Sequence, residues 1–495
     1  MDEDPWRDQL ARTDPVVPPA EPDHPPADPS PVEQWRTAFA DAVSRAPSRR
    51  RRAAVAVVTA LTVAGAGVSA GLLAQHLRSE PDSAASPTPT STSAQVDTAS
   101  PAEIKPLSDL LARRSAAVIA HNRAAFLADL DPKAAGFMAS QIQLYNNLVA
   151  LPLSQWAYTV LPQGEFTRPD LATKYGAPIR AQAVMLRYSL KGFDQGAVAR
   201  ALIYTFVQRD GAWRLGGDAD LDSLLPPGGH AEPWDVQPIA VVRGKSSIVI
   251  GAKAESAELR REAALVDRAV GKVAKMWSSG WSRHVVVITA TDQRVIKTYF
   301  RGESLAQLPQ TAAIHVTTFG NLFGWYGSGF PVNGATGDRI IFNPKARIPA
   351  DDLIFVLTHE VTHQATQPLQ GGGDPTWLVE GIAEYTAYRE FRLRGIDLPP
   401  VLRADLKDGI DFLPTNTTFY SRDADDNYVE AWLACAYIAD RYGEKTLRRF
   451  FTRVAANTDP TTVSEAEDAA FRSTLKTDRA AFLKGLTAYV RKVSS

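Results

Sequence analysis

Residues 359–363 read His-Glu-Val-Thr-His, a spacing that suits metal chemistry. On a helix, side chains four residues apart lie on the same face, so His359 and His363 can bind one Zn²⁺ together. Glu360 between them can then reach a water molecule on that ion. The same pattern also fits a helix that only exposes two histidines on its surface. A third ligand is needed to decide between these two interpretations.

The next segment offers two acids for that role. Residues 377–385 read Trp-Leu-Val-Glu-Gly-Ile-Ala-Glu-Tyr, and 16 residues separate His363 from Glu380. Glu384 follows one helical turn later, with 20 residues between it and His363, so both acids would lie on one helix face. Either glutamate could complete a site with three protein ligands, which leaves zinc a fourth position for water.

Two predicted helices must hold these side chains. In the first, Asp351 and Asp352 suit the first turn, and the apolar run 353–358 would bury the helix in a core. This run directly precedes the paired histidines, so the first helix is expected to be anchored where the chemistry requires it.

The second helix has its own start and stop signals. The sequence predicts Asp374 as its N-cap, Pro375 as its first residue and Gly395 as its C-terminal stop. Between the helices, glycines 371–373 would let the chain reverse, and Gly381 would let another element approach the second helix closely.

Together these motifs resemble those of the gluzincin metallopeptidases, the thermolysin-like and aminopeptidase-like clan, whose signature is HExxH followed by a Glu on the next helix. The run WLxEGxAEY is the specific part of the likeness. The resemblance implies that Glu380 is the third zinc ligand and that Glu384 orients the first histidine, His359. The interval from His363 is shorter than in the better-known branches, so Glu384 stays open as an alternative ligand.

The resemblance also implies a mechanism, the zinc-dependent hydrolysis of peptide bonds. Zinc held by His359, His363 and Glu380 would acidify a water molecule and polarise the scissile carbonyl. Glu360 would act as the general base and pass the proton to the leaving amine.

The likeness continues along residues 428–443, which are similar to the helix after the metal site in related enzymes. There a Tyr or His donates a hydrogen bond to the tetrahedral oxyanion, and Tyr428 is the first candidate for this role, with Tyr420 the second. A tyrosine packed in the helical core fits the sequence equally well.

Residues 338–343 read as a strand before the first helix. The resemblance implies that this strand is a sheet edge that pairs with extended substrate. The stretch 320–337 would be a lid or specificity loop, or else a solvent loop pinned by buried aromatic residues. His315, in a predicted strand at 312–316, is expected to be a packed core residue rather than a ligand.

An uncharged segment predicts a membrane anchor. Residues 53–74 are 22 residues without a charge, directly after Arg49–Arg52. The predicted transmembrane helix, 53–75, is long enough to span a bilayer, and the arginines would keep the N-terminus in the cytoplasm. A signal peptide is the competing interpretation, but about 50 residues precede the apolar core, which is too long for one. Gly67 and Gly71 could mark a dimer interface within this segment.

Composition characterises the flanking parts. Residues 1–52 are rich in Pro and Asp and predict a disordered cytoplasmic tail, whereas 76–103 predict a Ser/Thr/Pro-rich linker. The net charge of −1 and the absence of a basic block beyond the membrane-flanking arginines argue against a nucleic-acid partner. The single cysteine, Cys435, excludes an intrachain disulfide, and the composition resembles that of actinobacterial proteins.

The rest of the chain predicts an α+β fold. Residues 104–225 are expected to form an accessory domain that begins with a helix at 107–130. Strand-like runs follow at 180–192 and 197–215, with a hairpin turn at Asp210-Gly211. Helices followed by an antiparallel sheet resemble nuclear-transport-factor-like domains, for which a binding or spacer role is the default.

A linker at 226–238 is expected to lead to a gluzincin-like metallopeptidase domain at 239–495, with a mixed sheet and a helical C-terminal part. Its predicted elements are strands at 239–242, 247–250, 285–288 and 312–316, a helix at 258–277 and a closing helical run at 463–493.

Two classes of function follow from these motifs. One is a single-pass, membrane-anchored zinc metallopeptidase that acts on peptides or proteins outside the cytoplasmic membrane. The other is a catalytically inactive envelope protein that keeps the peptidase fold and binds a partner through its accessory domain. A protein of the second class has no need of Glu360, so the complete residue set favours the enzyme.

Overall fold

The computed structural model describes residues 96–224, 231–299, 312–320, 335–344, 348, 350–391, 393–396, 398–420 and 424–495. These residues form an α+β structure with one antiparallel and one mixed sheet, so the predicted fold class is confirmed at this level. No helix among them is both long and apolar enough to cross a bilayer. The predicted tail at 1–52 and transmembrane helix at 53–75 lie outside the described residues.

The first sheet is built from five antiparallel strands in sequential order. Its members are β1 (Val96–Asp97), β2 (Leu153–Phe166), β3 (Ile179–Leu190), β4 (Val198–Arg209) and β5 (Ala212–Gly217). The predicted hairpin is confirmed: Arg209 pairs with Ala212, and both turn residues between them have positive φ, +49° at Asp210 and +77° at Gly211.

Helices accompany this sheet, and one helix prediction is corrected. The helix expected at 107–130 is two helices, α4 (Pro101–Ile119) and α5 (Arg123–Ala128). Asn122 causes the break, because its side-chain oxygen accepts a hydrogen bond from the Ala125 amide and so starts a new helix. The other helices here are α6 (Ala135–Leu148) and α7 (Pro169–Tyr175).

The described part of the predicted linker, residues 231–238, packs into the structure. Short helix α8 (Pro233–Val236) carries Trp234, which shares a hydrophobic cluster with α4, α6 and strands of the second sheet. Asn147 on α6 donates hydrogen bonds to the carbonyls of Trp234 and Gln237. The two sheets therefore share part of one core.

The second sheet has the order β6-β7-β8-β10-β9. Its strands are β6 (Ile239–Arg243), β7 (Ser247–Ala252), β8 (Val285–Thr289), β10 (Ala335–Phe342) and β9 (Ala313–Phe319). The parallel pairing of β7 with β8 requires a crossover, which is supplied by α9 (Ser256–Met276). The strands and the helix predicted here are confirmed, and α10 (Gln293–Tyr299) follows β8.

One expectation about this sheet is wrong. The strand before the histidine helix, β10, is not an edge, because it pairs with β8 on one side and β9 on the other. Residues 340–342 of β10 are therefore paired on both sides, and the edge strands of this sheet are β9 and β6.

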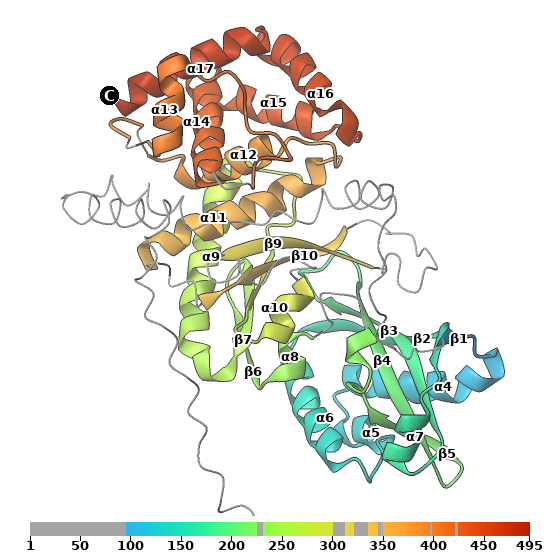
Figure 1. Cartoon of the computed structure of the whole chain (residues 1–495). Helices are drawn as coiled ribbons and strands as arrows, with labels where there is room; N and C mark the ends of the chain where they lie inside the picture. Colours follow the sequence, from blue (N-terminus) through green and yellow to red (C-terminus); the bar gives the residue numbers. More distant parts are fainter. Residues whose placement is uncertain are drawn as a thin grey trace, which may run out of the picture. The chain divides into compact units, whose positions relative to one another are not determined.

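The histidine helix α11 (Ala350–Thr366) lies between the second sheet and the C-terminal helices (Figure 1). It packs on α9 and β9 on one side and on α12 (Thr376–Tyr388) on the other. The predicted acidic first turn is present, since Asp352 occupies it, and Leu353, Leu357 and Val361 are buried.

The start and end of α12 differ from the prediction. Pro375 is its N-cap, and the helix ends at Tyr388, well before Gly395. A residue far along the chain, Asn416, determines where α12 starts. Its side chain accepts a hydrogen bond from the Thr376 amide at 2.8 Å and donates one to the Asp374 carbonyl at 3.0 Å. This long-range cap replaces the local one expected from Asp374.

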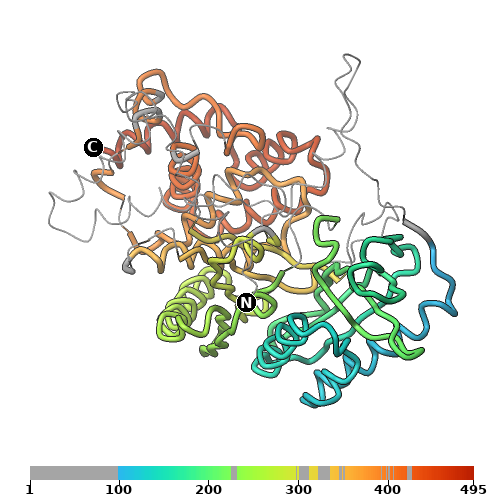
Figure 2. Tube along the Cα trace, turned by 60° about the horizontal axis from the view of Figure 1, so that its bottom comes forward, coloured from blue at the N-terminus to red at the C-terminus, as the bar shows by residue number. Residues whose placement is uncertain are grey.

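The helices of the C-terminal part form the orange to red segments of Figure 2. They are α13 (Pro400–Asp408), α14 (Ala424–Tyr442), α15 (Glu444–Ala455), α16 (Val463–Ala470), a π-helical turn (Phe471–Leu475) and α17 (Arg479–Ser494). Helix α12 packs on α14 and α15 of this part. Gly381 permits the predicted close approach, because a Cβ there would lie 2.5 Å from the Ala431 carbonyl oxygen on α14.

Candidate metal centre

The two histidines of α11 are buried. His359 is 1% and His363 is 5% exposed, so the interpretation as a surface helix is excluded. Neighbouring polar residues on the helix are satisfied locally, since the Thr358 and Thr362 hydroxyls donate to carbonyls one turn earlier at 2.6 and 2.7 Å. The two imidazoles, like the Glu360 carboxyl group, therefore require partners from outside the helix.

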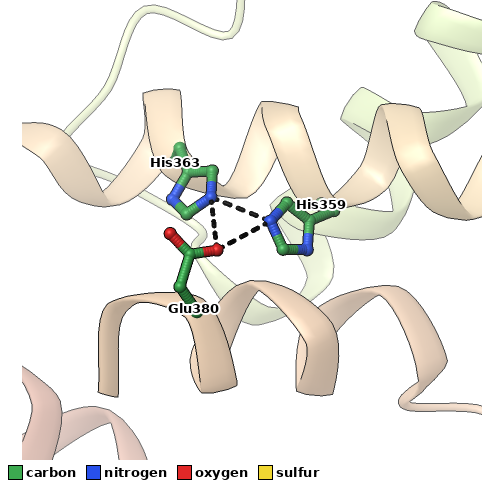
Figure 3. A group of neighbouring side chains, drawn as sticks. All are labelled: His359, His363 and Glu380. Atoms are coloured by element: carbon green, nitrogen blue, oxygen red, sulfur yellow. Dashed lines mark hydrogen bonds and ion pairs between the residues drawn. The ribbon is translucent and has the colours of Figure 1, made fainter. Parts of the chain in front are cut away.

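Glu380 on α12 reaches both imidazoles, as Figure 3 shows. Its Oε2 lies 3.2 Å from His359 Nε2 and 3.5 Å from His363 Nε2, and the two Nε2 atoms are 2.9 Å apart. Three ligand atoms at about 2.1 Å from a tetrahedral zinc ion would be roughly 3.4 Å from one another. The group could therefore bind a metal ion.

Glu384 takes a different position from Glu380. Its Oε1 lies 2.9 Å from Nδ1 of His359, on the opposite side of the ring from Nε2. A carboxylate there holds the proton on Nδ1 and leaves the Nε2 lone pair for a metal. The structure thus brings Glu380, not Glu384, to both Nε2 atoms.

The pKa values of the three candidate ligands are shifted by burial and by the charges of their neighbours. Burial alone would lower the pKa of His359, but the carboxylates of Glu384, Glu380 and Glu360 together outweigh it and raise the pKa well above the usual value. Burial would likewise raise the pKa of Glu380, yet His363 and His359 bring it far below its usual value. Burial dominates at His363 and lowers its pKa. Glu380 is therefore held as a carboxylate, the form that binds metals.

Glu360 is fully buried beside this group. Burial raises its pKa to about 8, and the nearby His359 opposes that shift. Neither carboxyl oxygen accepts a hydrogen bond of normal geometry from the described residues, although the backbone amide of His315 is close enough to lower the pKa somewhat. A metal dication at the neighbouring ligands would favour the ionised form.

The two tyrosines proposed for the oxyanion occupy different places. The Tyr428 ring is fully buried, 6.3 Å from the His359 ring and 4.9 Å from the Phe419 ring. Tyr420 is 38% exposed, and its hydroxyl donates a hydrogen bond to Glu380 Oε1 at 2.9 Å. Tyr420 therefore contacts the acidic ligand directly, through the oxygen that faces away from the histidines.

A histidine–aspartate pair adjoins the site, and the sequence analysis missed it. His315 on β9 stacks on His363 with ring centroids 6.4 Å apart, and its Nε2 lies 2.8 Å from Asp338 Oδ1. In the β9–β10 register, His315 faces Ile340, so Asp338 is its diagonal neighbour on the same sheet face. The two residue types were visible in the sequence, but the register that pairs them was not.

The fold and this geometry define a buried His₂Glu group on two packed helices that could bind a metal ion. Most of the predicted lid, 321–334, lies outside the described residues. Comparison with models of known protein families gives no match, and comparison with curated proteins finds no relative.

Proposed function

We propose that this chain is a zinc-dependent metallopeptidase of the gluzincin type. The observation that carries the proposal is the conjunction of His359, His363 and Glu380 at zinc-compatible separations with a buried acid, Glu360, beside them. Zinc is favoured among metals because two imidazoles and a carboxylate are its usual ligands in catalytic sites. Such a ligand set leaves one coordination position for substrate or water.

In this proposal each residue has a distinct task. A zinc ion held by the three ligands would supply Lewis acidity, polarising the peptide carbonyl and lowering the pKa of a water molecule. Glu384 fixes the ring and tautomer of His359 through Nδ1. Glu360 accepts a proton from the attacking water and delivers it to the leaving amine, for which its unpaired oxygens are suited. Tyr428 remains the first and Tyr420 the second candidate to donate a hydrogen bond to the oxyanion.

The place of action is also a proposal, and it is supported by sequence alone. The uncharged segment at 53–75 after four arginines favours a single-pass membrane protein whose catalytic part lies outside the cytoplasmic membrane. Peptides or proteins in that space would be its substrates.

The non-catalytic alternative accounts less well for Glu360. A buried carboxyl group without hydrogen-bond partners is destabilising, at a cost of about 1–3 kcal/mol. A protein that only binds a partner through residues 104–225 gains nothing from this cost, whereas a hydrolase requires the group.

Metal content of the purified full-length chain, measured by mass spectrometry, tests the ligand set. One zinc per chain is expected in the wild type and should be lost in His363→Ala and Glu380→Ala. His284→Ala, which removes an exposed histidine, is the matched control and should retain zinc. Zinc that persists without Glu380 would contradict the assignment.

Hydrolysis of a peptide library separates the two function classes. Glu360→Gln should keep zinc and lose hydrolysis, because it retains the ligands and removes the base. If a fully zinc-loaded wild-type chain cleaves nothing in peptide and protein libraries, the enzyme proposal is wrong.

A further inference from the structure

A polar pocket of about 190 Å³ lies next to the metal-binding group. Four parts of the chain form it: the turn between β3 and β4, the loop before β8, the first half of β10, and the end of α11 with the 3₁₀ turn (Gln367–Leu369) that follows it. The residues that matter for its chemistry are Gln195, Trp281, Asp338, Gln364 and Gln367.

The wall contributed by the accessory region is fixed in place. The backbone amides of Gln195 and Gly196 both donate to the Thr336 carbonyl, at 2.8 and 2.9 Å. Next to them, Asp194 forms two hydrogen bonds with Arg339 on β10, at 2.6 and 3.0 Å, and both side chains are completely buried. The β3–β4 turn is thus held against the start of β10 by a charged pair and two backbone bonds.

Direct contacts connect this pocket to the metal-binding residues. Asp338 in the pocket wall binds His315, and the His315 ring stacks on the ligand His363. Gln364, another wall residue, is the next residue after His363 on α11. The pocket wall is therefore linked to the candidate ligand His363 through His315 and through the chain itself.

Gln364 presents an acceptor that lacks a partner. Its Nε2 donates to the His284 carbonyl at 2.9 Å, and a carbonyl can only accept, so this bond fixes the orientation of the amide. The other end is then Oε1, which is buried and accepts no hydrogen bond from the described residues. Such an atom calls for a donor from a ligand or from water.

The side chains that line the pocket carry a negative charge. Among the described residues that line the pocket, Asp338 is the only one with a charged side chain, and none of them is a lysine or an arginine. Gln195 and Gln367 add amide oxygens, and Trp281 adds an aromatic ring that can attract a cation. The volume corresponds to roughly six water molecules, which is enough for one long side chain.

From these contacts we infer that the pocket is a specificity site for a lysine or arginine side chain of the substrate. The inference rests on the proposed peptidase function. A cationic side chain donates hydrogen bonds to Asp338 and to Gln364 Oε1. An apolar side chain would leave Gln364 Oε1 without a donor, and Asp338 would repel an acidic one. Because Gln195 comes from the accessory region, that region takes part in substrate choice.

Cleavage of matched peptides by the zinc-loaded full-length chain tests the inference. In a set of otherwise uncharged fluorogenic peptides, one lysine is moved through the positions on both sides of the scissile bond. At each position it is compared with norleucine, which has the same length without charge, and with glutamate. We expect one position at which kcat/KM is roughly 10- to 100-fold higher for lysine than for norleucine. Equal values at every position would overturn the inference while leaving the peptidase proposal intact.

Two charge variants locate the preference. Gln195→Lys and Gln367→Lys each place a cation in the pocket wall and should abolish the lysine preference. Gln370→Lys adds the same charge outside the pocket and should retain it. A preference that survives in both pocket variants would place the specificity elsewhere.

A binding measurement keeps the inference testable if nothing is cleaved. The same peptides are titrated into zinc-loaded Glu360→Gln chain by calorimetry. Lysine-selective binding that Gln195→Lys abolishes would uphold the pocket even though the peptidase proposal had failed. Equal affinity for the lysine and norleucine peptides would overturn the pocket as well.

Discussion

Two fully buried glutamates, Glu232 and Glu360, have opposite surroundings. Glu232 lies just before α8, where its carboxylate accepts hydrogen bonds from the Tyr188 hydroxyl at 2.9 Å, from Arg200 Nε at 2.7 Å and from the Tyr299 hydroxyl. These donors come from β3, β4 and α10, so one carboxylate ties together three elements. Glu360, equally buried, has no such donors among the described residues.

This difference distinguishes a buried acid that stabilises the fold from a buried acid that is available for chemistry. A carboxylate whose lone pairs are filled by the protein stabilises the fold and offers nothing to a ligand. One whose oxygens are left unpaired lowers stability and remains free to exchange protons. Glu262 on α9 is intermediate, since Oε2 accepts from Thr289 at 2.5 Å while Oε1 has no partner in the described structure.

The largest expected effect is on catalysis at Glu360. Glu360→Gln should lower kcat for peptide hydrolysis by about 10²–10⁴-fold, because it removes the general base. Its free energy of unfolding should stay within about 1 kcal/mol of wild type, since no hydrogen bond from the protein is lost. Kinetics on the best library peptide and urea denaturation measure the two quantities. A stability loss as large as that of Glu232→Gln would remove the contrast.

Glu232→Gln should have the converse effect. It leaves the buried Arg200 without its counter-charge, so the free energy of unfolding should fall by about 3–5 kcal/mol. Urea denaturation at neutral pH measures this, with Glu258→Gln on the exposed face of α9 as a control that changes stability little. An unchanged midpoint would mean that the Glu232 contacts do not support the fold.

The half-paired Glu262 should make stability depend on pH. Burial raises its pKa from 4.5 to about 7, so between these values the folded chain holds a proton that the unfolded chain has released. This contribution to stability is complete below about pH 4.5 and is lost as the pH rises through 7. Relative to Glu262→Gln, the wild type should therefore lose about 2.5 kcal/mol between pH 5 and pH 8. If the free energy of unfolding depends on pH in the same way for both proteins, the raised pKa of Glu262 would be refuted.

The smallest effect is expected at Glu384, which pairs with His359 without reaching the metal position. Glu384→Gln keeps a hydrogen-bond acceptor for Nδ1 but loses the charge, so zinc affinity should fall by about 10- to 100-fold. Competition with a chromophoric chelator measures this, and the exposed Glu390→Gln serves as a control. Complete loss of zinc in Glu384→Gln would instead make Glu384 a ligand.

Local patterns predicted the parts of the fold that depend on local sequence. Helix α9 and strands β7 and β8 follow from apolar periodicity, and the β4–β5 turn follows from Asp210-Gly211. In the site, the spacing of His359 and His363 on one helix was enough to predict their common direction. The choice of Glu380 was supported by family resemblance, and spacing alone left Glu384 equally open.

Long-range partners account for what the sequence did not reveal. Asn416 decides where α12 begins, and the placement of β9 at the edge makes β10 an internal strand. The His315–Asp338 pair depends on strand register, which no short motif specifies. In each case the deciding contact joins residues far enough apart that only the folded chain brings them together.

The segment between α13 and α14 combines two contacts described above. Through Asn416 it caps the helix that carries Glu380, and through Tyr420 it binds the Glu380 carboxylate. A single local opening of this segment would break both contacts while the rest of the chain stays folded. A metal ion bound by Glu380 and the two histidines would then be able to leave through the opening of this one segment, without global unfolding.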